Sequence, residues 1–468
     1  MVPGLKLLGW SVILLAAGCA GSSAPPLPAG FERDPVPAEG RRPSPKTLPT
    51  TPVSLEQAVA LALERNPDLR AAAERIAIAD AHVEEATAVL YPQIGARLSY
   101  GRTDHPAQAF GMLAAQRRLS PTIDLNNPGT TGNWRSEIVA TLSLFRGFQD
   151  TNRVEAAKKA VEIAALERSS LRNAMAKAVT ETYFVHLAAT QRVEVADASV
   201  KAVESELLEA RKRFDAGALV RSDVLSLEVR LASARDDRVR AKNGVELART
   251  GLRVLLGLEP GESIELRTDF PPEDASLPRN REDALARAAT SRPELQAAAR
   301  LIALRQNELS AEQGAWFPSV DAFASYGLDA PDLVPSSKQD NWSVGLSVDL
   351  PLFNGFRTRA RVNSAERRIE EARAMESQVR LAVEQEVRTS ILRREEALER
   401  VSVLEKSVSA AEEALRLVRE QYQAGTATLT RFLDAEAALT DSRSRLIAGR
   451  TDVRRSEAEL RKAIGGWN

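Results

Sequence analysis

The sequence Leu144-Phe145-Arg146-Gly147-Phe148 occurs a second time, in closely related form, as Leu352-Phe353-Asn354-Gly355-Phe356. Each copy follows a segment of alternating apolar and polar residues and precedes a very long segment without proline. Alternation with a period of two residues is typical of a strand with one apolar face, whereas a long proline-free segment favours helix. We therefore interpret Gly147 and Gly355 as turns at which a strand is followed by a helix.

These two copies belong to a longer internal repeat. They lie 208 positions apart (144 to 352), and the pairs Asn133-Trp134 and Asn341-Trp342 keep that offset. Upstream, Tyr91-Pro92 and Phe317-Pro318 lie 226 positions apart, so the first copy carries 18 extra residues (226 less 208) between positions 102 and 132. A period this long indicates a duplicated half rather than a solenoid, and such an insertion belongs in an exposed loop.

The bulk composition narrows the class of protein. The 468 residues include 63 basic and 64 acidic side chains and a single cysteine. The balanced charge does not indicate nucleic-acid binding, and one cysteine can form neither an intrachain disulfide nor a cysteine-built metal site. After the N-terminal segment, no apolar stretch reaches the length of about 20 residues that a membrane-spanning helix needs.

The N-terminus is typical of an exported protein. Residues 1–18 carry one positive charge, an apolar segment and small residues directly before Cys19. This pattern resembles a bacterial lipoprotein signal peptide, in which Cys19 would be freed and acylated. The alternative is a plain secretory signal with an incidental cysteine. Residues 19–52 are rich in proline, glycine and serine, which predicts an extended linker without a core of its own.

Each repeat is expected to begin with two helices. Ser54 followed by Gln57 fits a capping box, and Asn66-Pro67 predicts a break before the second helix. The second repeat has Asn280 and Arg292-Pro293 at the corresponding places.

Four segments that alternate apolar and polar residues are predicted to be strands. They lie at about 93–101, 133–145, 319–327 and 341–352. Their lengths suit strands that cross a bilayer at a tilt, and the aromatic residues at their ends suit a membrane-interface girdle. These aromatic residues are Tyr100, Trp134, Tyr326 and Trp342. A soluble sandwich edge is the alternative.

Four strands are too few to close a barrel. An open sheet edge in lipid leaves backbone groups without hydrogen bonds, and known barrels begin at about eight strands. Several chains would therefore have to share one barrel, and three chains would supply twelve strands.

Each glycine turn is expected to be followed by a long helical hairpin. The segments 152–213 and 361–423 are about sixty residues each and would extend about 90 Å as helices. Gly217 and Gly425 suit the left-handed residue that ends a helix, and Ser222 and Thr430 are expected to cap the returning helices. We place the hairpin tips at about 214–225 and 422–433. Residues 261–279 link the first repeat, 53–260, to the second, 280–468.

The order of these features resembles the TolC-like outer-membrane efflux proteins, and the cysteine after the signal resembles their OprM-like lipoprotein branch. The resemblance rests on the paired Leu-Phe-X-Gly-Phe turns, the paired aromatic-proline strand starts and the paired Ala-Gly tips. It implies a mainly helical fold with a β-barrel part: a homotrimer with a twelve-stranded outer-membrane barrel and a periplasmic helical tunnel. It also implies a lipid-anchored exit channel that works with a periplasmic adaptor and an inner-membrane transporter of the RND or ABC type.

The same resemblance makes the hairpin tips the expected adaptor-docking and gating region. Gly217, Gly425, Ser222 and Thr430 are the candidate docking positions. Asp223, Arg431 and Asp434 are the candidate gate or tip charges, with ordinary solvated helix ends as the alternative. The second tip differs from the first in carrying a cation, Arg431, where the first carries Asp223.

An enzyme is not expected. His82, His105 and His186 lack the spacing of metal ligands, and the sequence contains no glycine-rich phosphate loop. We therefore assign no catalytic residue, metal or cofactor. The alternatives to an efflux channel are an outer-membrane channel for type I protein secretion and a lipid-anchored periplasmic coiled-coil adaptor or scaffold.

Overall fold

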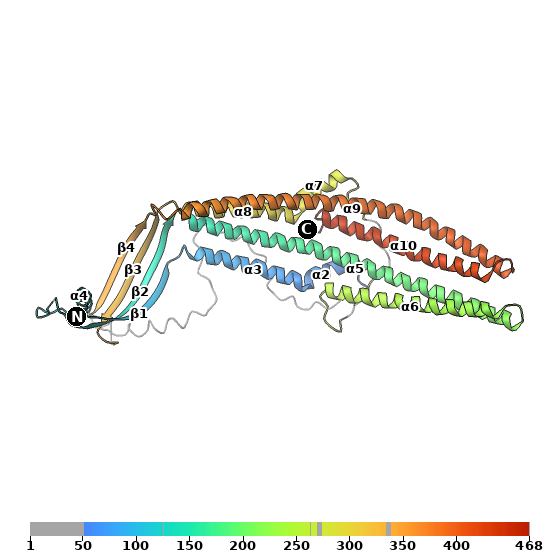
Figure 1. Cartoon of the computed structure of the whole chain (residues 1–468), viewed down its shortest axis with the longest axis horizontal. Coiled ribbons are helices and arrows are strands. Elements are labelled where there is room, and N and C mark those ends of the chain that lie inside the picture. The colour runs from blue at the N-terminus through green and yellow to red at the C-terminus, as the bar shows by residue number, and fades with distance from the viewer. Residues whose placement is uncertain (1–50, 125, 263, 269–273, 334–337, 468) are drawn as a thin grey trace. The chain divides into compact units, whose positions relative to one another are not determined.

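A computed structural model describes residues 51–467 except 125, 263, 269–273 and 334–337. Cys19 and the predicted signal peptide lie outside the described residues. Residues 50–468 form one compact unit. In this unit a four-stranded sheet is followed by two long helical hairpins, and each half of the sequence supplies two strands and one hairpin (Figure 1).

A helix pair opens each repeat. These helices are α2 (Leu55–Arg65), α3 (Pro67–Ala88), α7 (Arg281–Ser291) and α8 (Pro293–Gly314). The Ser54 side chain accepts a hydrogen bond from the backbone N–H of Gln57, whose side chain accepts one from Ser54 in return. Asn280 caps α7 in the same role. Proline begins both α3 and α8, where its missing N–H removes no helical hydrogen bond.

The four strands form one antiparallel sheet in chain order. They are β1 (Gln93–Thr103), β2 (Thr131–Arg146), β3 (Ser319–Ala330) and β4 (Asp340–Asp349). β2 pairs with both β1 and β3, while β1 and β4 are the two edges. Tyr100 lies opposite Trp134, and Tyr326 lies opposite Trp342. The aromatic residues expected to form a girdle are thus cross-strand neighbours in both repeats.

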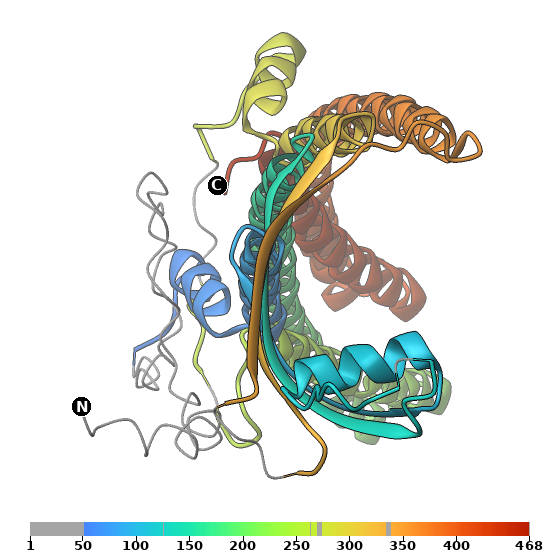
Figure 2. The ribbon, with the colours of Figure 1, turned by 90° about the vertical axis from the view of Figure 1, so that its left-hand side faces the viewer.

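The register gives the sheet one apolar and one polar face. The apolar face carries Ile94, Leu98, Ile138, Val344 and Leu346, which are between 42% and 73% exposed in the single chain. Directly opposed residues share a face, so Arg97, Glu137 and Asp321 lie together on the other side. Figure 2 shows that the sheet is strongly curved.

Each strand-to-helix turn contains two consecutive left-handed residues. Gly147 and Phe148 both have φ of 61°, and Gly355 and Phe356 have φ of 66° and 63°. Glycine adopts this conformation without a steric penalty, whereas phenylalanine does not. In both turns the second phenylalanine packs edge-to-face on the first, with centroids 5.3 Å apart in one repeat and 5.4 Å in the other.

The hairpins are longer than the sequence indicated. α5 (Gln149–Asp215) and α9 (Arg357–Gln423) contain 67 residues each. α6 (Arg221–Leu255) and α10 (Leu429–Ala463) contain 35 residues each and return alongside them. The long helices begin three or four residues earlier than predicted, because the chain becomes helical directly after each left-handed phenylalanine. No helix in the described part of the chain has an apolar stretch of the length and hydropathy needed to cross a membrane.

The two hairpins share a hydrophobic core near their tips. Its fully buried members include Val203 of α5, Leu227 of α6 and Phe432 of α10. Burying one such side chain contributes about 1.5–3 kcal/mol, so this cluster stabilises the contacts among α5, α6, α9 and α10.

Candidate functional site

Each long hairpin ends in a left-handed glycine. Gly217 and Gly425 have φ of +75° and +78°. In the first tip the N–H of Ala218 donates to the carbonyl oxygen of Arg213 at 2.8 Å, and the second tip repeats this bond. This helix ending needs a residue that tolerates positive φ. Among the described residues, a Cβ added at either glycine would meet nothing within 4 Å, so both glycines face open space.

The predicted caps of the returning helices are wrong. α6 begins after Val220, whose side chain offers no hydrogen-bond acceptor, and α10 begins after Thr428, whose hydroxyl accepts from the N–H of Arg431 at 3.3 Å. Ser222 and Thr430 already lie in the first turn of their helices. The helix begins where the extended backbone ends, at ψ of 152° and 155°, two residues earlier than the side-chain types suggested.

The three predicted tip charges are not joined to one another. Asp223 is half-buried in the first turn of α6, while Arg431 and Asp434 are exposed on α10. Asp223 is close enough to Tyr422 of α9 to affect its pKa. Arg431 and Asp434, by contrast, lie where solvated charges at a helix end would lie in a single chain.

An aromatic pair forms the centre of the tip core. The rings of Tyr422 and Phe432 stack with centroids 5.5 Å apart. Arg213 of the first hairpin lies 5.7 Å from the Tyr422 ring, so this contact crosses between the hairpins. Burial, together with the charges of Glu206 and Asp223, raises the pKa of Tyr422 against the opposing effect of Arg213. This environment therefore favours the neutral phenol of Tyr422.

A buried ion pair that the sequence analysis missed joins the two hairpins. Glu436 of α10 is 4% exposed and accepts from Ser199 Oγ of α5 at 2.7 Å and from Arg230 Nε of α6 at 3.1 Å. Thr440 Oγ1 donates to the same carboxylate at 3.2 Å. The available signal was the spacing Phe432, Glu436, Leu439, which places a carboxylate on a buried apolar stripe.

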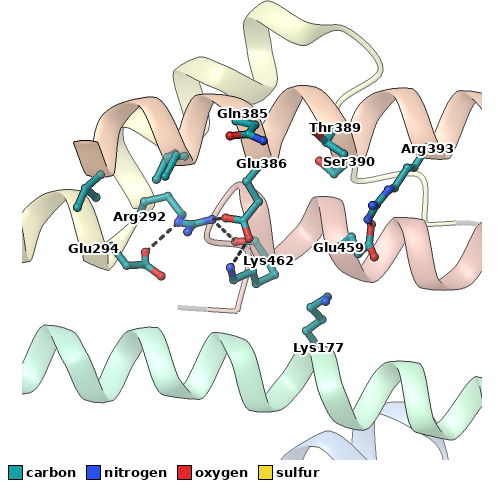
Figure 3. Close-up of a pocket in the computed structure, with 13 residues that line it drawn as sticks. Lys177, Arg292, Glu294, Gln385, Glu386, Thr389, Ser390, Arg393, Glu459 and Lys462 are labelled. Atoms are coloured by element: carbon teal, nitrogen blue, oxygen red, sulfur yellow. Dashed lines mark hydrogen bonds and ion pairs between the residues drawn. The ribbon is translucent and has the colours of Figure 1, made fainter. Parts of the chain in front are cut away.

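A second polar cluster lines a cavity of about 560 Å³ between α5, α8, α9 and α10 (Figure 3). Arg292 is 4% exposed, and it donates to Glu386 at 2.6 Å and to Glu294 at 2.8 Å. Lys462 makes a further ion pair with Glu386. Burial acts to raise the pKa of Glu386, but the hydrogen bond from Lys462 and the Arg292 charge outweigh it and leave that pKa below its usual value. The paired charges make this cluster a junction between helices.

The polar face of the sheet also carries ion pairs. Arg146 lies 3.3 Å from Asp321, and Arg97 lies 3.8 Å from Glu137 across the β1–β2 pair. A curved sheet with an apolar outer face and a charged inner face can separate lipid from water. The two faces of this sheet are therefore suited to a wall with lipid on one side and water on the other.

Comparisons with known proteins agree with this architecture. A family model described as outer membrane efflux protein matches residues 58–258 and 284–466. Outer membrane efflux protein BepC of Brucella suis is 25% identical over 418 residues, which cover 88% of this chain and 85% of BepC. The alkaline protease secretion protein AprF of Pseudomonas aeruginosa is 24% identical over 400 residues, covering 80% of this chain and 82% of AprF.

A solved structure shows the same fold. The Campylobacter jejuni CmeC outer membrane channel superposes with a TM-score of 0.77 at 16% identity, covering 88% of this chain and 85% of CmeC. The predicted fold class is thereby confirmed. The family model matches both repeats, and the sheet and hairpins agree with it. This chain therefore belongs to the outer membrane efflux protein family and is an outer-membrane efflux channel.

Proposed function

We propose that three copies of this chain close into one duct that serves as the exit of a tripartite efflux system. The first support is the sheet, whose edge strands β1 and β4 have no second neighbouring strand among the residues that the structure describes. Because an unpaired strand edge is unfavourable in lipid, β4 of one copy would pair with β1 of the next. Three copies of a four-stranded sheet would give the twelve strands expected of the family.

The repeat itself supports closure between copies. α5 contacts both α3 and α8, while its repeat equivalent α9 contacts α8. The second helix contact that α9 lacks would come from α3 of a neighbouring copy.

The two turn glycines differ in the same way. A Cβ at Gly147 would lie 2.1 Å from the carbonyl oxygen of Gly314 at the end of α8, whereas a Cβ at Gly355 would meet nothing within 4 Å of the described chain. The end of a neighbour's α3 is the equivalent surface for Gly355.

Exposed apolar side chains near the second turn fit the same arrangement. Leu352, Phe353 and Phe356 are 89%, 76% and 66% exposed in the single chain. Large apolar side chains this exposed, gathered in one place, are typical of a surface that a partner covers. In the proposed trimer they would lie at the junction with the next copy.

The hairpin tips are the proposed contact with a periplasmic adaptor. Gly217 and Gly425 present open backbone at the end of the hairpins, as described above, and small residues allow close approach by a partner helix. An inner-membrane transporter of the RND or ABC type would load the duct through that adaptor. Asp223, Arg431 and Asp434 would each appear three times around the axis of the trimer and are the proposed gate charges.

Acylation of Cys19 is the proposed anchor of the N-terminus in the membrane. Lipid burial contributes about 0.8 kcal/mol per CH₂ group, so several acyl chains would hold this end in the bilayer. Metabolic labelling with palmitate checks this step, and a Cys19→Ser variant that still incorporates the label would overturn it.

Protein secretion is the second candidate, since AprF is named for the secretion of a protease. Deleting the gene in its host separates the two functions. Efflux predicts increased sensitivity to small toxic compounds with an unchanged set of secreted proteins. Secretion predicts the loss of a protein from the medium with unchanged sensitivity. If neither changes and the purified protein is not a trimer, the proposal fails.

A further inference from the structure

The 18-residue insertion of the first repeat forms a helix that lies against the inside of the sheet. α4 (Pro106–Ala115) lies on the concave side of the curved sheet, at the end far from the hairpins (Figures 1 and 2). A Cβ at Gly101 of β1 would lie 3.4 Å from the Met112 methyl group, which places α4 over the polar face. Ala109 and Leu113 are 0% and 8% exposed, so α4 is packed rather than extended into solvent.

A buried carboxylate lies at the base of this helix. Asp329 of β3 is 2% exposed, and its two oxygens accept from Asn133 Nδ2 at 2.5 Å and Asn341 Nδ2 at 2.9 Å. These two asparagines are the equivalent residues of the two repeats, at the 208-residue offset found in the sequence. A buried carboxylate is costly unless hydrogen-bonded, so this pairing fixes the relative positions of β2, β3 and β4.

The same asparagines hold the end of α4. Asn341 Nδ2 also donates to the carbonyl oxygen of Ala115 at 3.2 Å, and Gln116 Nε2 donates to Asn133 Oδ1 at 2.8 Å. The Gln116 side chain is 1% exposed. We call Gln116, Asn133, Asp329 and Asn341 the clamp.

Arg117 adds a strained connection beside the clamp. Its φ is +58°, a left-handed conformation that costs a non-glycine residue about 1–2 kcal/mol. Its guanidinium donates to the carbonyl oxygen of Asp340 at the start of β4, at 3.1 Å. The end of α4 is therefore held by hydrogen bonds to residues of β2 and β4.

We propose that α4, held by the clamp, narrows the outer mouth of the duct and sets the largest solute that can pass. This rests on the proposed trimer, in which the polar face of the sheet lines the passage and three copies of α4 enter it. The clamp ties α4 to three of the four strands, so the constriction is a fixed part of the wall. Residues of α4 that face the passage, among them exposed Gln108 and Phe110, would contact the leaving solute.

Size-graded cysteine labelling of intact cells tests the proposal. A Ser347→Cys variant places a thiol on the polar face of β4, deeper than α4, in a chain whose only other cysteine is Cys19. Cells are treated from outside with a small maleimide and with maleimides on polyethylene glycol chains of increasing length. The chain without Ser347→Cys reports any labelling of Cys19.

We expect the small reagent to label Ser347→Cys and the long reagents to be excluded. Replacing residues 104–118 with a short Gly-Ser linker should raise labelling by the long reagents to the level of the small one. Asp329→Asn, which removes one of the acceptors in the clamp, should raise it in part. Asp349→Asn is the matched control, because it removes an exposed carboxylate from the other end of the same polar face.

The outcomes separate this inference from the proposed function. Equal labelling by long reagents with and without α4, or their exclusion in both, would overturn the constriction while leaving the channel. Absence of labelling by the small reagent in trimers located in the outer membrane would contradict the water-filled passage itself.

Discussion

Glu436 is a buried residue through which polar contacts join the two hairpins. It accepts from donors on α5, α6 and α10, and its side chain is 4% exposed while that of Arg230 is 22% exposed. Charges of this kind contribute little net stability as a pair, but removing one partner leaves the other without compensation. The hairpins are therefore joined by an interaction that is sensitive to single substitutions.

We expect Glu436→Ala to lower the free energy of unfolding by about 3 kcal/mol, because the Arg230 guanidinium would remain partly buried and unpaired. Chemical denaturation of the purified protein measures this. Glu204→Ala is the control, since its pair with Arg235 joins α5 to α6 at 2.8 Å with side chains 44% and 55% exposed. Exposed pairs contribute about 0–1 kcal/mol. Equal losses in the two variants would contradict the assigned role of burial.

The junction around Arg292 should depend on pH. The pKa of Glu386 is lowered in the folded protein, so its ion pairs stabilise the fold fully above the ordinary glutamate pKa of 4.5. This stabilisation is lost as the pH falls from 4.5 through the lower folded pKa. Glu386→Gln should therefore be less stable than the parent chain at neutral pH, and the difference should shrink in acid. Thermal unfolding at several pH values measures the stability of both chains. If the difference in stability stayed constant from neutral to acidic pH, the charge of the Glu386 carboxylate would not contribute to it.

At the scale of elements, each hairpin combines closely packed helices with an exposed turn. The helices pack along their length through small and aliphatic residues, whereas the turns at Gly217 and Gly425 have open space around them. A substitution at these turns can therefore change what binds there without disturbing the packing behind it.

We expect Gly217→Val and Gly425→Val to abolish efflux while the trimer remains intact. The added side chain meets nothing in the described chain, so the loss would arise from strain in a left-handed turn, about 1–2 kcal/mol, and from obstruction of the docking surface. Drug sensitivity and heat-modifiable migration measure the two properties. Gly129→Val is the matched control, because Gly129 has φ of +74° and equally open space in the loop beyond the sheet. Unchanged sensitivity in both tip variants would exclude the tips as docking sites.

At the scale of the whole molecule, the two faces of the sheet decide how the chain lies in the membrane. Val344 and Ser343 are neighbours on β4, but Val344 shares a face with Ala324 and Ser343 with Ser325. The first face is apolar and the second is polar. The proposed trimer places the apolar face against lipid.

Val344→Arg should reduce the amount of trimer in the outer membrane, because arginine on the lipid face of a barrel costs about 2–4 kcal/mol near the bilayer centre. Ser343→Arg, one residue away, should be tolerated because it faces water. The amount of heat-modifiable trimer in membrane fractions is measured for both arginine variants. Equal tolerance of both arginines would mean that this sheet does not separate lipid from water.

The sequence by itself determined the order of strands, turns and hairpins and the existence of two equivalent halves. Gly147, Gly355, Gly217 and Gly425 all have positive φ and lie between the elements that they were expected to separate. These features depend on the preferences of a few neighbouring residues, which any reader of the chain can see. The hydrophobic periodicity and the positions of proline and glycine therefore predicted most of the secondary-structure elements and their order.

Only the tertiary structure decided which distant residues meet. Arg230 and Glu436 are 206 residues apart, and Asn133 and Asp329 are 196 apart. No local pattern specifies such partners, since they depend on how whole helices and strands pack. The sequence likewise did not predict the helix caps at Val220 and Thr428 or the placement of α4 inside the curved sheet. Local backbone preference fixed the elements, and long-range burial of polar groups fixed their contacts.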